Sequence, residues 1–235
     1  MSRMVLILLP GMDGTGKLFE SFVTALAGQL ETRVVRYPTG KSLDYQELEQ
    51  VVRASIPSHG SVILLGESFS GPIAVSLAAS LGDRVAGLVL CCSFVRNPLP
   101  ALSRLRGLID AMPVSRIPVG ALSYFLLGRF SSGALRAALA ASLADVASEV
   151  MRARMRAVLT VDVSDKLRQI HVPLLYLQAV HDRVMPRAAG ELVMRLAPHA
   201  QLVKFDAPHF LLQAVPHEAA GVVTNFAAQV MSECA

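Results

Sequence analysis

Short runs of hydrophobic residues alternate along the chain with segments in which hydrophobic residues recur at helical spacing. Six runs rich in Val, Ile and Leu predict buried strands at residues 4–9, 33–36, 62–65, 85–91, 173–178 and 201–205. They lack a clean two-residue alternation, which is typical of parallel strands buried on both faces. Helical spacing predicts helices at residues 18–30, 45–56, 70–81, 187–196 and 216–231. The alternation predicts an α/β fold with a doubly wound, mostly parallel sheet of about six strands.

One segment breaks this alternation. Residues 96–166 contain no convincing strand, carry four prolines between positions 98 and 118, and continue into a stretch rich in alanine and leucine. We therefore expect a core formed by residues 1–95 and 167–235, interrupted by a helical cap or lid insertion at 96–166. Because the insertion follows the fourth strand, we expect it over the carboxyl ends of the strands. A separate helical subdomain without a catalytic role is the alternative.

The composition favours one large folded domain. Hydrophobic residues make up 53% and charged residues 17% of the 235 positions, which argues against disorder. No stretch reaches the roughly 18 apolar residues of a membrane helix, and the first ten residues lack the features of a secretory signal. We therefore expect a cytoplasmic protein with no stable membrane insertion.

The net charge of +4 is spread unevenly, because residues 96–168 hold eleven Lys and Arg against five Asp and Glu. These basic residues are dispersed among leucines and alanines without interleaved aromatic residues, so we expect no nucleic-acid partner. The usual interpretation of such a pattern is a solvated helical face. The weaker interpretation is steering of acidic substrates, such as acyl chains carried on CoA or on a carrier protein.

The cysteines and histidines do not predict a metal centre. Three cysteines, two of them adjacent at Cys91 and Cys92, favour neither a disulfide framework nor a zinc site. Both adjacent cysteines are expected inside a strand rather than at its end, which disfavours a catalytic thiol. No pair among the six histidines has metal-ligand spacing. We expect no metal and no organic cofactor.

The most informative motif is Gly-Glu-Ser-Phe-Ser-Gly at residues 66–71, directly after the predicted strand at 62–65. A strand that enters a turn of small residues and then a helix is typical of a nucleophile elbow. Such a turn presents the hydroxyl of its serine, here Ser68, to a pocket. Nucleophilic attack by serine also requires a base and a group that orients the base.

Two later strand ends supply candidates for these groups. His209 follows the last predicted strand and is the expected base, and Asp182 follows the preceding strand and is the expected acid. The order Ser68, Asp182, His209 along the chain is specific to one fold. His181, beside the proposed acid, is the main rival base.

Donors for a developing oxyanion are expected from two backbone N–H groups. One belongs to Phe69, at the start of a helix, and the other to Met12, in the glycine-rich loop after the first strand. Asp13 and Glu67 are possible substrate contacts, although capping of a helix and a hydrogen bond within the elbow are the more usual roles of such residues. Tyr124 and Phe125 lie in an apolar run that either lines an acyl pocket or packs within the cap.

On these motifs the chain resembles the α/β-hydrolase fold superfamily over nearly its whole length. The resemblance implies this fold, a serine triad and a variable cap where residues 96–166 lie. Two further strands that begin many members are missing from the predicted pattern, which implies a compact member. Ser70 stands where a second glycine is common, and Pro10-Gly11 replaces the common His-Gly before the oxyanion loop.

We expect a serine hydrolase that cleaves carboxylic ester or thioester bonds of a small-molecule substrate through an acyl-enzyme. The same triad also runs acyl transfer, C–C bond cleavage or elimination, and acts at interfaces in lipases. A non-catalytic ligand-binding protein is a further alternative. Residues 11–18 match a phosphate-binding P-loop except at Leu18, where a hydroxyl residue is required. A nucleotide-binding enzyme is therefore the second class of hypothesis.

Overall fold

The computed structural model describes residues 4–110, 112–114 and 117–233. Its centre is a six-stranded sheet in the order β2-β1-β3-β4-β5-β6, in which every neighbouring pair is parallel. The strands are β1 Val5–Leu9, β2 Glu31–Val34, β3 Val62–Glu67, β4 Val85–Cys91, β5 Leu174–Ala179 and β6 Gln201–Phe205. The predicted α/β class with a doubly wound parallel sheet is thereby confirmed.

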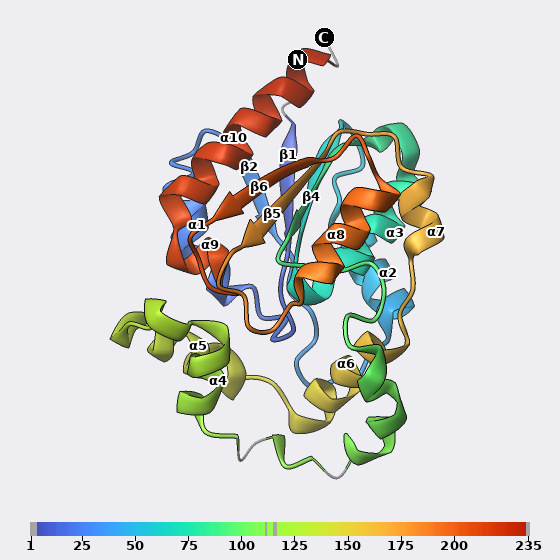
Figure 1. Cartoon of the computed structure of the whole chain (residues 1–235). Helices are drawn as coiled ribbons and strands as arrows, with labels where there is room; N and C mark the ends of the chain where they lie inside the picture. The colour runs from blue at the N-terminus through green and yellow to red at the C-terminus, as the bar shows by residue number, and fades with distance from the viewer. Residues whose placement is uncertain (1–3, 111, 115–116, 234–235) are drawn as a thin grey trace.

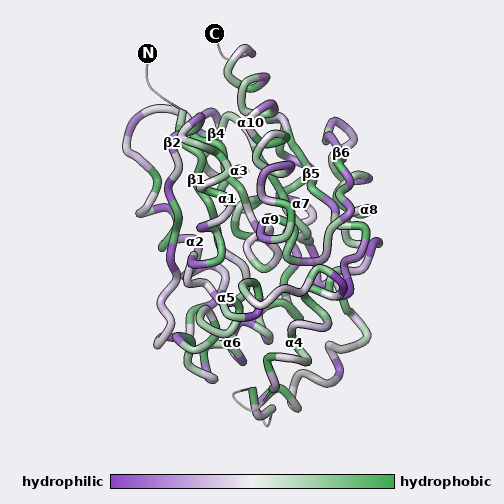
Figure 2. The backbone as a smooth tube through the Cα atoms, turned by 90° about the vertical axis from the view of Figure 1, so that its left-hand side faces the viewer, coloured by the Kyte–Doolittle hydropathy of each residue, from purple (hydrophilic) through white to green (hydrophobic). Residues whose placement is uncertain are grey.

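Both faces of the sheet are covered by helices, as Figure 1 shows. On one face lie α2 Tyr45–Ser55, α3 Gly71–Leu81 and α8 Arg187–Leu196, and on the other lie α1 Glu20–Ala25 and α10 Pro216–Glu233. Alternate residues of β1 serve the two layers: Val5, Ile7 and Leu9 join the first core, and Leu6 and Leu8 join the second. Figure 2 shows the hydrophobic residues concentrated along these central strands.

Local sequence explains where several elements begin and end. Helix α2 begins with a capping box, in which Asp44 and Glu47 each accept a hydrogen bond from the other residue's backbone N–H. The helix predicted at 18–30 is shorter than expected. A 3-10 turn, η1 Lys17–Phe19, precedes α1, which ends at Ala25 because Ala27 and Gly28 adopt left-handed φ angles of 49° and 72°.

The two edge strands differ from the prediction of strands buried on both faces. Along β2, exposed residues alternate with half-buried ones, and most of β6 is exposed. Each edge strand has a neighbour on one side only, so its outer residues meet solvent. The prediction holds for the four central strands, of which β1, β3 and β4 are buried throughout.

The residues described between 96 and 166 form helices rather than strands. They are η4 Pro100–Leu108, α4 Val119–Leu126, η6 Gly128–Phe130, α5 Gly133–Ala144, α6 Ser148–Thr160 and the start of α7 Ser164–Arg168. In Figure 1, α4, α5 and α6 lie beyond the carboxyl ends of the strands. The start of β1 and the end of α10 lie at the opposite end of the molecule.

Candidate active site

Ser68 stands at a sharp turn between β3 and α3. The strand passes at Glu67 into the 3-10 turn η2 Ser68–Ser70, and α3 follows without a break. Ser68 has a φ of 47°, which an L-residue other than glycine rarely adopts. A Cβ at Gly66 would lie 2.9 Å from the Ala74 Cβ, so glycine is needed where the helix turns back over the strand.

The side chains of Ser68, His209 and Asp182 form one hydrogen-bonded chain. Ser68 Oγ lies 2.9 Å from His209 Nε2, and His209 Nδ1 lies 2.7 Å from Asp182 Oδ2. The histidine and aspartate side chains are only 5% and 7% exposed, while Ser68 is half-buried. The three residues follow β3, β5 and β6, whose carboxyl ends meet at the same edge of the parallel sheet.

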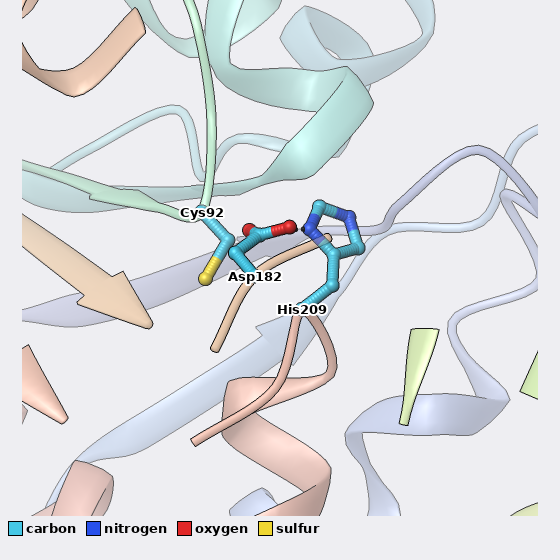
Figure 3. Close-up of side chains that lie close together, drawn as sticks. All are labelled: Cys92, Asp182 and His209. Carbon is cyan, nitrogen blue, oxygen red and sulfur yellow. Dashed lines mark hydrogen bonds and ion pairs between the residues drawn. The ribbon is translucent and has the colours of Figure 1, made fainter. Parts of the chain in front are cut away.

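The orientation of Asp182 is fixed by its second oxygen. Asp182 Oδ1 accepts hydrogen bonds from the backbone N–H groups of Val184 and Met185, at 2.8 and 2.7 Å. Figure 3 shows the carboxylate pointing to the His209 ring, with the Cys92 thiol beside it. The atoms of Cys92, Asp182 and His209 that could ligate a metal ion lie within 4.8 Å of one another. Both oxygens of the Asp182 carboxylate already accept hydrogen bonds within the chain.

The position of the cysteines differs from the prediction. Cys91 is the last residue of β4, and Cys92 lies beyond the strand with a φ of 46°. Both thiols are buried and free, and burial raises the pKa of the Cys91 thiol well above its ordinary value. The adjacent pair therefore sits at the carboxyl end of the strand and not inside it.

The rival base, His181, makes different contacts. Its ring is exposed, and its Nε2 lies 2.6 Å from Asp206 Oδ1, a carboxylate that also pairs with Arg129 at 2.6 Å. His209 is the histidine that contacts Ser68.

Met12 lies in the loop of residues 10–16 that follows β1, which we call the β1 loop. The Gly14 N–H donates to the Gly11 carbonyl at 3.0 Å, so Met12 and Asp13 are the central residues of a tight turn. Within the described chain, the Met12 N–H donates no hydrogen bond to another protein atom. It thus remains available to a bound group.

Phe69, the middle residue of η2, is held in place by Tyr45. The two rings stack with centroids 4.8 Å apart, and the Tyr45 hydroxyl donates to the Phe69 carbonyl at 3.0 Å. The helical segment formed by η2 and α3 begins at Ser68. The partial positive charge at this N-terminal end favours an anion.

Glu67 is buried beneath this turn and contacts the chain rather than solvent. Its Oε1 accepts a hydrogen bond from Gln213 Nε2 at 2.9 Å, which connects the elbow to the helix α9 Leu211–Ala214. Burial raises the pKa of Glu67 from 4.5 to about 7, against the lowering effects of Gln213, His209 and the Gly11 backbone. The side chain thus stays protonated at mildly acidic pH.

Asp13 and Ser70 are both bound within the chain. Asp13 Oδ2 accepts from the Thr15 N–H at 2.9 Å and from the Thr15 hydroxyl at 2.5 Å, which shapes the β1 loop. The Ser70 hydroxyl contacts the Tyr37 hydroxyl at 2.7 Å and donates to the Pro10 carbonyl. Where a glycine is common in the motif, this serine therefore connects the elbow to the β1 loop.

Tyr124 and Phe125 are exposed on α4, at 60% and 52%. Arg183 donates to the Tyr124 carbonyl at 3.1 Å, and its guanidinium carbon lies 4.5 Å from the centre of the Tyr124 ring. Tyr124 borders a pocket of about 260 Å³ whose lining includes neither Ser68 nor His209. The Phe210 N–H donates to the Leu126 carbonyl at 3.2 Å, so α4 lies beside the residue that follows His209.

Arg154 is the residue that sequence reasoning missed. Its side chain on α6 is 1% exposed, so the interpretation of the basic residues as a solvated face is wrong at this position. The guanidinium donates to the carbonyls of Met12, Asp13 and Pro38. Helical spacing could have indicated that Arg154 is buried, because the hydrophobic Val150 lies four residues earlier on the same buried face of the helix.

The chain belongs to the alpha/beta hydrolase family, whose model matches residues 6–222. The comparison with curated proteins gave no match. No helix in residues 4–110, 112–114 and 117–233 combines the length and the hydrophobicity that a membrane crossing requires.

Solved structures share the fold at low sequence identity. A hydrolase from Pseudomonas aeruginosa PA01 is 20% identical, with a TM-score of 0.81 over 95% of this chain and 89% of its own. A thermophilic esterase from Thermogutta terrifontis is 20% identical, with a TM-score of 0.80 over 98% and 91%. The enol-lactonase from Burkholderia xenovorans LB400 is 18% identical, with a TM-score of 0.79 over 99% and 92%.

Proposed function

We propose that the protein is a serine hydrolase that cleaves carboxylic ester or thioester bonds of a small molecule. The observation that carries this proposal is the hydrogen-bonded chain from Ser68 Oγ through His209 to Asp182, with Ser68 at a strained turn. Backbone strain of this kind clusters at sites where a side chain is presented to a ligand. Membership of a hydrolase family supports the same reaction class.

In the first half of the reaction, His209 Nε2 takes the proton of the Ser68 hydroxyl as Oγ attacks the acyl carbonyl. Asp182 accepts the hydrogen bond of Nδ1–H, which holds the neutral ring in the tautomer whose Nε2 is free to accept. It also stabilises the imidazolium that forms. The protonated His209 then gives its proton to the leaving alcohol or thiol, and the ester or thioester bond breaks.

In the second half, a water molecule attacks the acyl-enzyme. His209 takes a proton from this water and returns it to Ser68 Oγ as the acid product leaves, so that the enzyme is restored. During both attacks the negative charge on the carbonyl oxygen is held by the N–H groups of Met12 and Phe69. Asp13 and Glu67 are bound within the chain, so we assign them to support of these loops rather than to substrate contact.

The test is turnover of short nitrophenyl esters and acyl thioesters by the wild-type protein and by Ser68→Ala. We expect kcat to fall roughly 10⁴-fold or more in the variant, because residual catalysis comes only from oxyanion binding and positioning. A fluorophosphonate probe should label Ser68 in the wild-type protein, as located by peptide mass spectrometry. Ser232→Ala, on the exposed end of α10, is the matched control.

Unchanged ester turnover in folded Ser68→Ala, or labelling at another residue, contradicts the proposal. A wild-type protein that neither labels nor turns over any substrate contradicts it as well and leaves the ligand-binding alternative. Transfer of the acyl group to an added alcohol in preference to water would reassign the protein as an acyltransferase with the same nucleophile.

A further inference from the structure

A buried arginine of the insertion contacts the β1 loop. Arg154 Nη1 donates to the carbonyls of Met12 and Asp13 at 2.9 and 2.8 Å, and Nη2 donates to the carbonyl of Pro38 at 3.0 Å. Within the described residues, no carboxylate oxygen lies at ion-pair distance from this guanidinium. A full positive charge is thus satisfied by backbone carbonyls and by the Tyr37 ring, whose centre lies 5.7 Å from Cζ.

Burial of the charged Arg154 guanidinium costs free energy unless its N–H groups are all well placed for hydrogen bonds. Burial disfavours the charged form and lowers the pKa of Arg154 from its ordinary value. An exposed arginine would not have this desolvation cost. We therefore explain the burial of Arg154 by the three backbone carbonyls that it binds. The fork of guanidinium N–H groups contacts carbonyls of two separate loops at once, which a compact ammonium cannot reproduce.

The contacts of Arg154 hold the two peptide groups that follow the Met12 N–H in the β1 loop. This N–H belongs to the same peptide unit as the Gly11 carbonyl, which accepts from Gly14. Arg154 holds the next two carbonyls, and a Cβ at Gly14 would lie 2.6 Å from Arg154 Nη1, so the guanidinium packs directly against the turn. The Gly14 carbonyl in turn accepts from the Tyr37 N–H at 2.8 Å. Arg154 therefore restrains the turn that contains the Met12 N–H.

The helix that carries Arg154 is itself anchored to the core. Asp145, just before α6, pairs with Lys17 at 2.6 Å, and the Ala147 N–H donates to the Thr39 carbonyl at 3.0 Å. These contacts bring the start of α6 to the loops after β1 and β2. The position of Arg154 is consequently not that of a side chain on a freely opening lid.

We propose that Arg154 is a positioning residue for the oxyanion site: from the insertion, it holds the β1 loop in the conformation that aims the Met12 N–H at the substrate oxygen. The proposal rests on the proposed function, in which Met12 supplies one of the two oxyanion donors. Arg154 touches neither the triad nor, by this proposal, the substrate. Its effect is therefore expected in the transition state, where charge develops on the oxygen, and not in ground-state binding.

The experiment compares Arg154→Met and Arg154→Lys with Arg156→Met. Arg156 lies on the same helix and pairs with Asp110 at the surface, with its side chain 44% exposed, so it controls for loss of a basic residue from α6. For each protein we would measure kcat and KM on the best nitrophenyl ester. We would also measure the affinity for a trifluoromethyl ketone with the same acyl chain, which forms a tetrahedral oxyanion on Ser68.

Removal of one oxyanion donor typically costs about 10²- to 10³-fold in kcat. Because Arg154→Met would displace the donor rather than delete it, we expect a loss of roughly 10- to 100-fold in kcat with KM within about twofold. Affinity for the ketone should fall by a similar factor. Arg154→Lys should be intermediate, because one ammonium keeps the charge but not the fork. Arg156→Met should match the wild-type protein in all three quantities.

A wild-type kcat and ketone affinity in folded Arg154→Met would overturn the inference, as would a loss confined to KM. Should both Arg154 variants fail to fold, the residue supports the domain as a whole and the inference is also overturned. Failure of the proposed function is a separate result, because it is seen in the wild-type protein as the absence of turnover and of fluorophosphonate labelling.

Discussion

The Ser93 hydroxyl donates a hydrogen bond of 2.5 Å to the backbone carbonyl of Ser68. Ser93 lies just beyond β4, the strand next to β3, so the contact joins two neighbouring strand ends. It supports a residue whose backbone conformation costs about 1–3 kcal/mol. The same hydroxyl lies where a Cβ at Gly71 would be, at 1.9 Å, which explains the glycine at the end of the elbow motif.

Substitution of Gly71 by alanine should therefore be more damaging than loss of the Ser93 hydroxyl. We expect Ser93→Ala to lower the free energy of unfolding by about 1–2 kcal/mol through its hydrogen bond, and Gly71→Ala to lower it by about 2–3 kcal/mol through overpacking. Urea unfolding measures both. The double variant should lose less than the sum of the two, because the shorter side chain relieves part of the clash. Additive losses would contradict this account.

Asp182→Asn tests the proposed role of the acid. Its Oδ1 can still accept from Val184 and Met185, so the loop should fold, while an amide NH₂ facing His209 Nδ1 favours the wrong tautomer. We expect kcat on a nitrophenyl ester to fall by about 10³- to 10⁴-fold. His181→Ala is the control and should stay near the wild-type rate. A larger loss in the control than in Asp182→Asn would contradict the role proposed for Asp182 and would favour His181 as the base.

Glu67 makes stability depend on pH with a definite sign. Its pKa is raised from 4.5 to about 7, so between these values the folded protein keeps a proton that the unfolded chain releases. The contribution of this side chain to stability is fully present below pH 4.5 and is lost as the pH rises through about 7.

Glu67→Gln should remove this dependence, because the amide stays neutral. We expect the free energy of unfolding of the variant, relative to wild type, to increase by up to about 3 kcal/mol from pH 5 to pH 8. Urea unfolding at both values measures the change. Glu20→Gln, at an exposed position of α1, is the control and should show no such increase. An equal pH dependence in Glu67→Gln and wild type would show that the carboxyl group is already ionised at pH 5.

The two adjacent cysteines should not react with alkylating reagents in the folded protein. Cys91 and Cys92 are 0% and 2% exposed, and the raised pKa of Cys91 keeps its thiol protonated. Iodoacetamide is expected to modify neither residue under native conditions and both after unfolding in urea, as measured by peptide mass spectrometry. Rapid native alkylation of Cys92 with loss of ester turnover would point instead to an accessible thiol beside Asp182.

The strand pattern could be predicted because burial on both faces leaves nearly continuous hydrophobic runs. The bounds of β4 and β6 agree with the prediction, and so do those of α8. Helix α1 was predicted too long, because hydrophobic spacing continues past Ala25 while the backbone at Ala27 turns left-handed. Hydrophobic spacing alone does not predict this left-handed backbone conformation.

Parts of the candidate site could also be nominated from the sequence. Ser68, Asp182 and His209 each follow a strand, and parallel strands bring their carboxyl ends to one edge. Their contact distances required the strand order, because Ser68 and His209 are 141 positions apart. The contacts of Arg154 could not be predicted, because its carbonyl partners come from two loops that contact α6 only in the folded tertiary structure.

The arrangement of the chain ends has a practical consequence for experiments on this protein. The first strand starts, and the last helix finishes, at the end of the molecule opposite to the carboxyl ends of the strands, and Ser68 follows the carboxyl end of β3. A purification tag or surface linker attached at either end of the chain is therefore expected to leave the edge of the sheet that carries Ser68 facing away from the support. Immobilised preparations should accordingly keep substrate access whichever terminus is chosen for attachment.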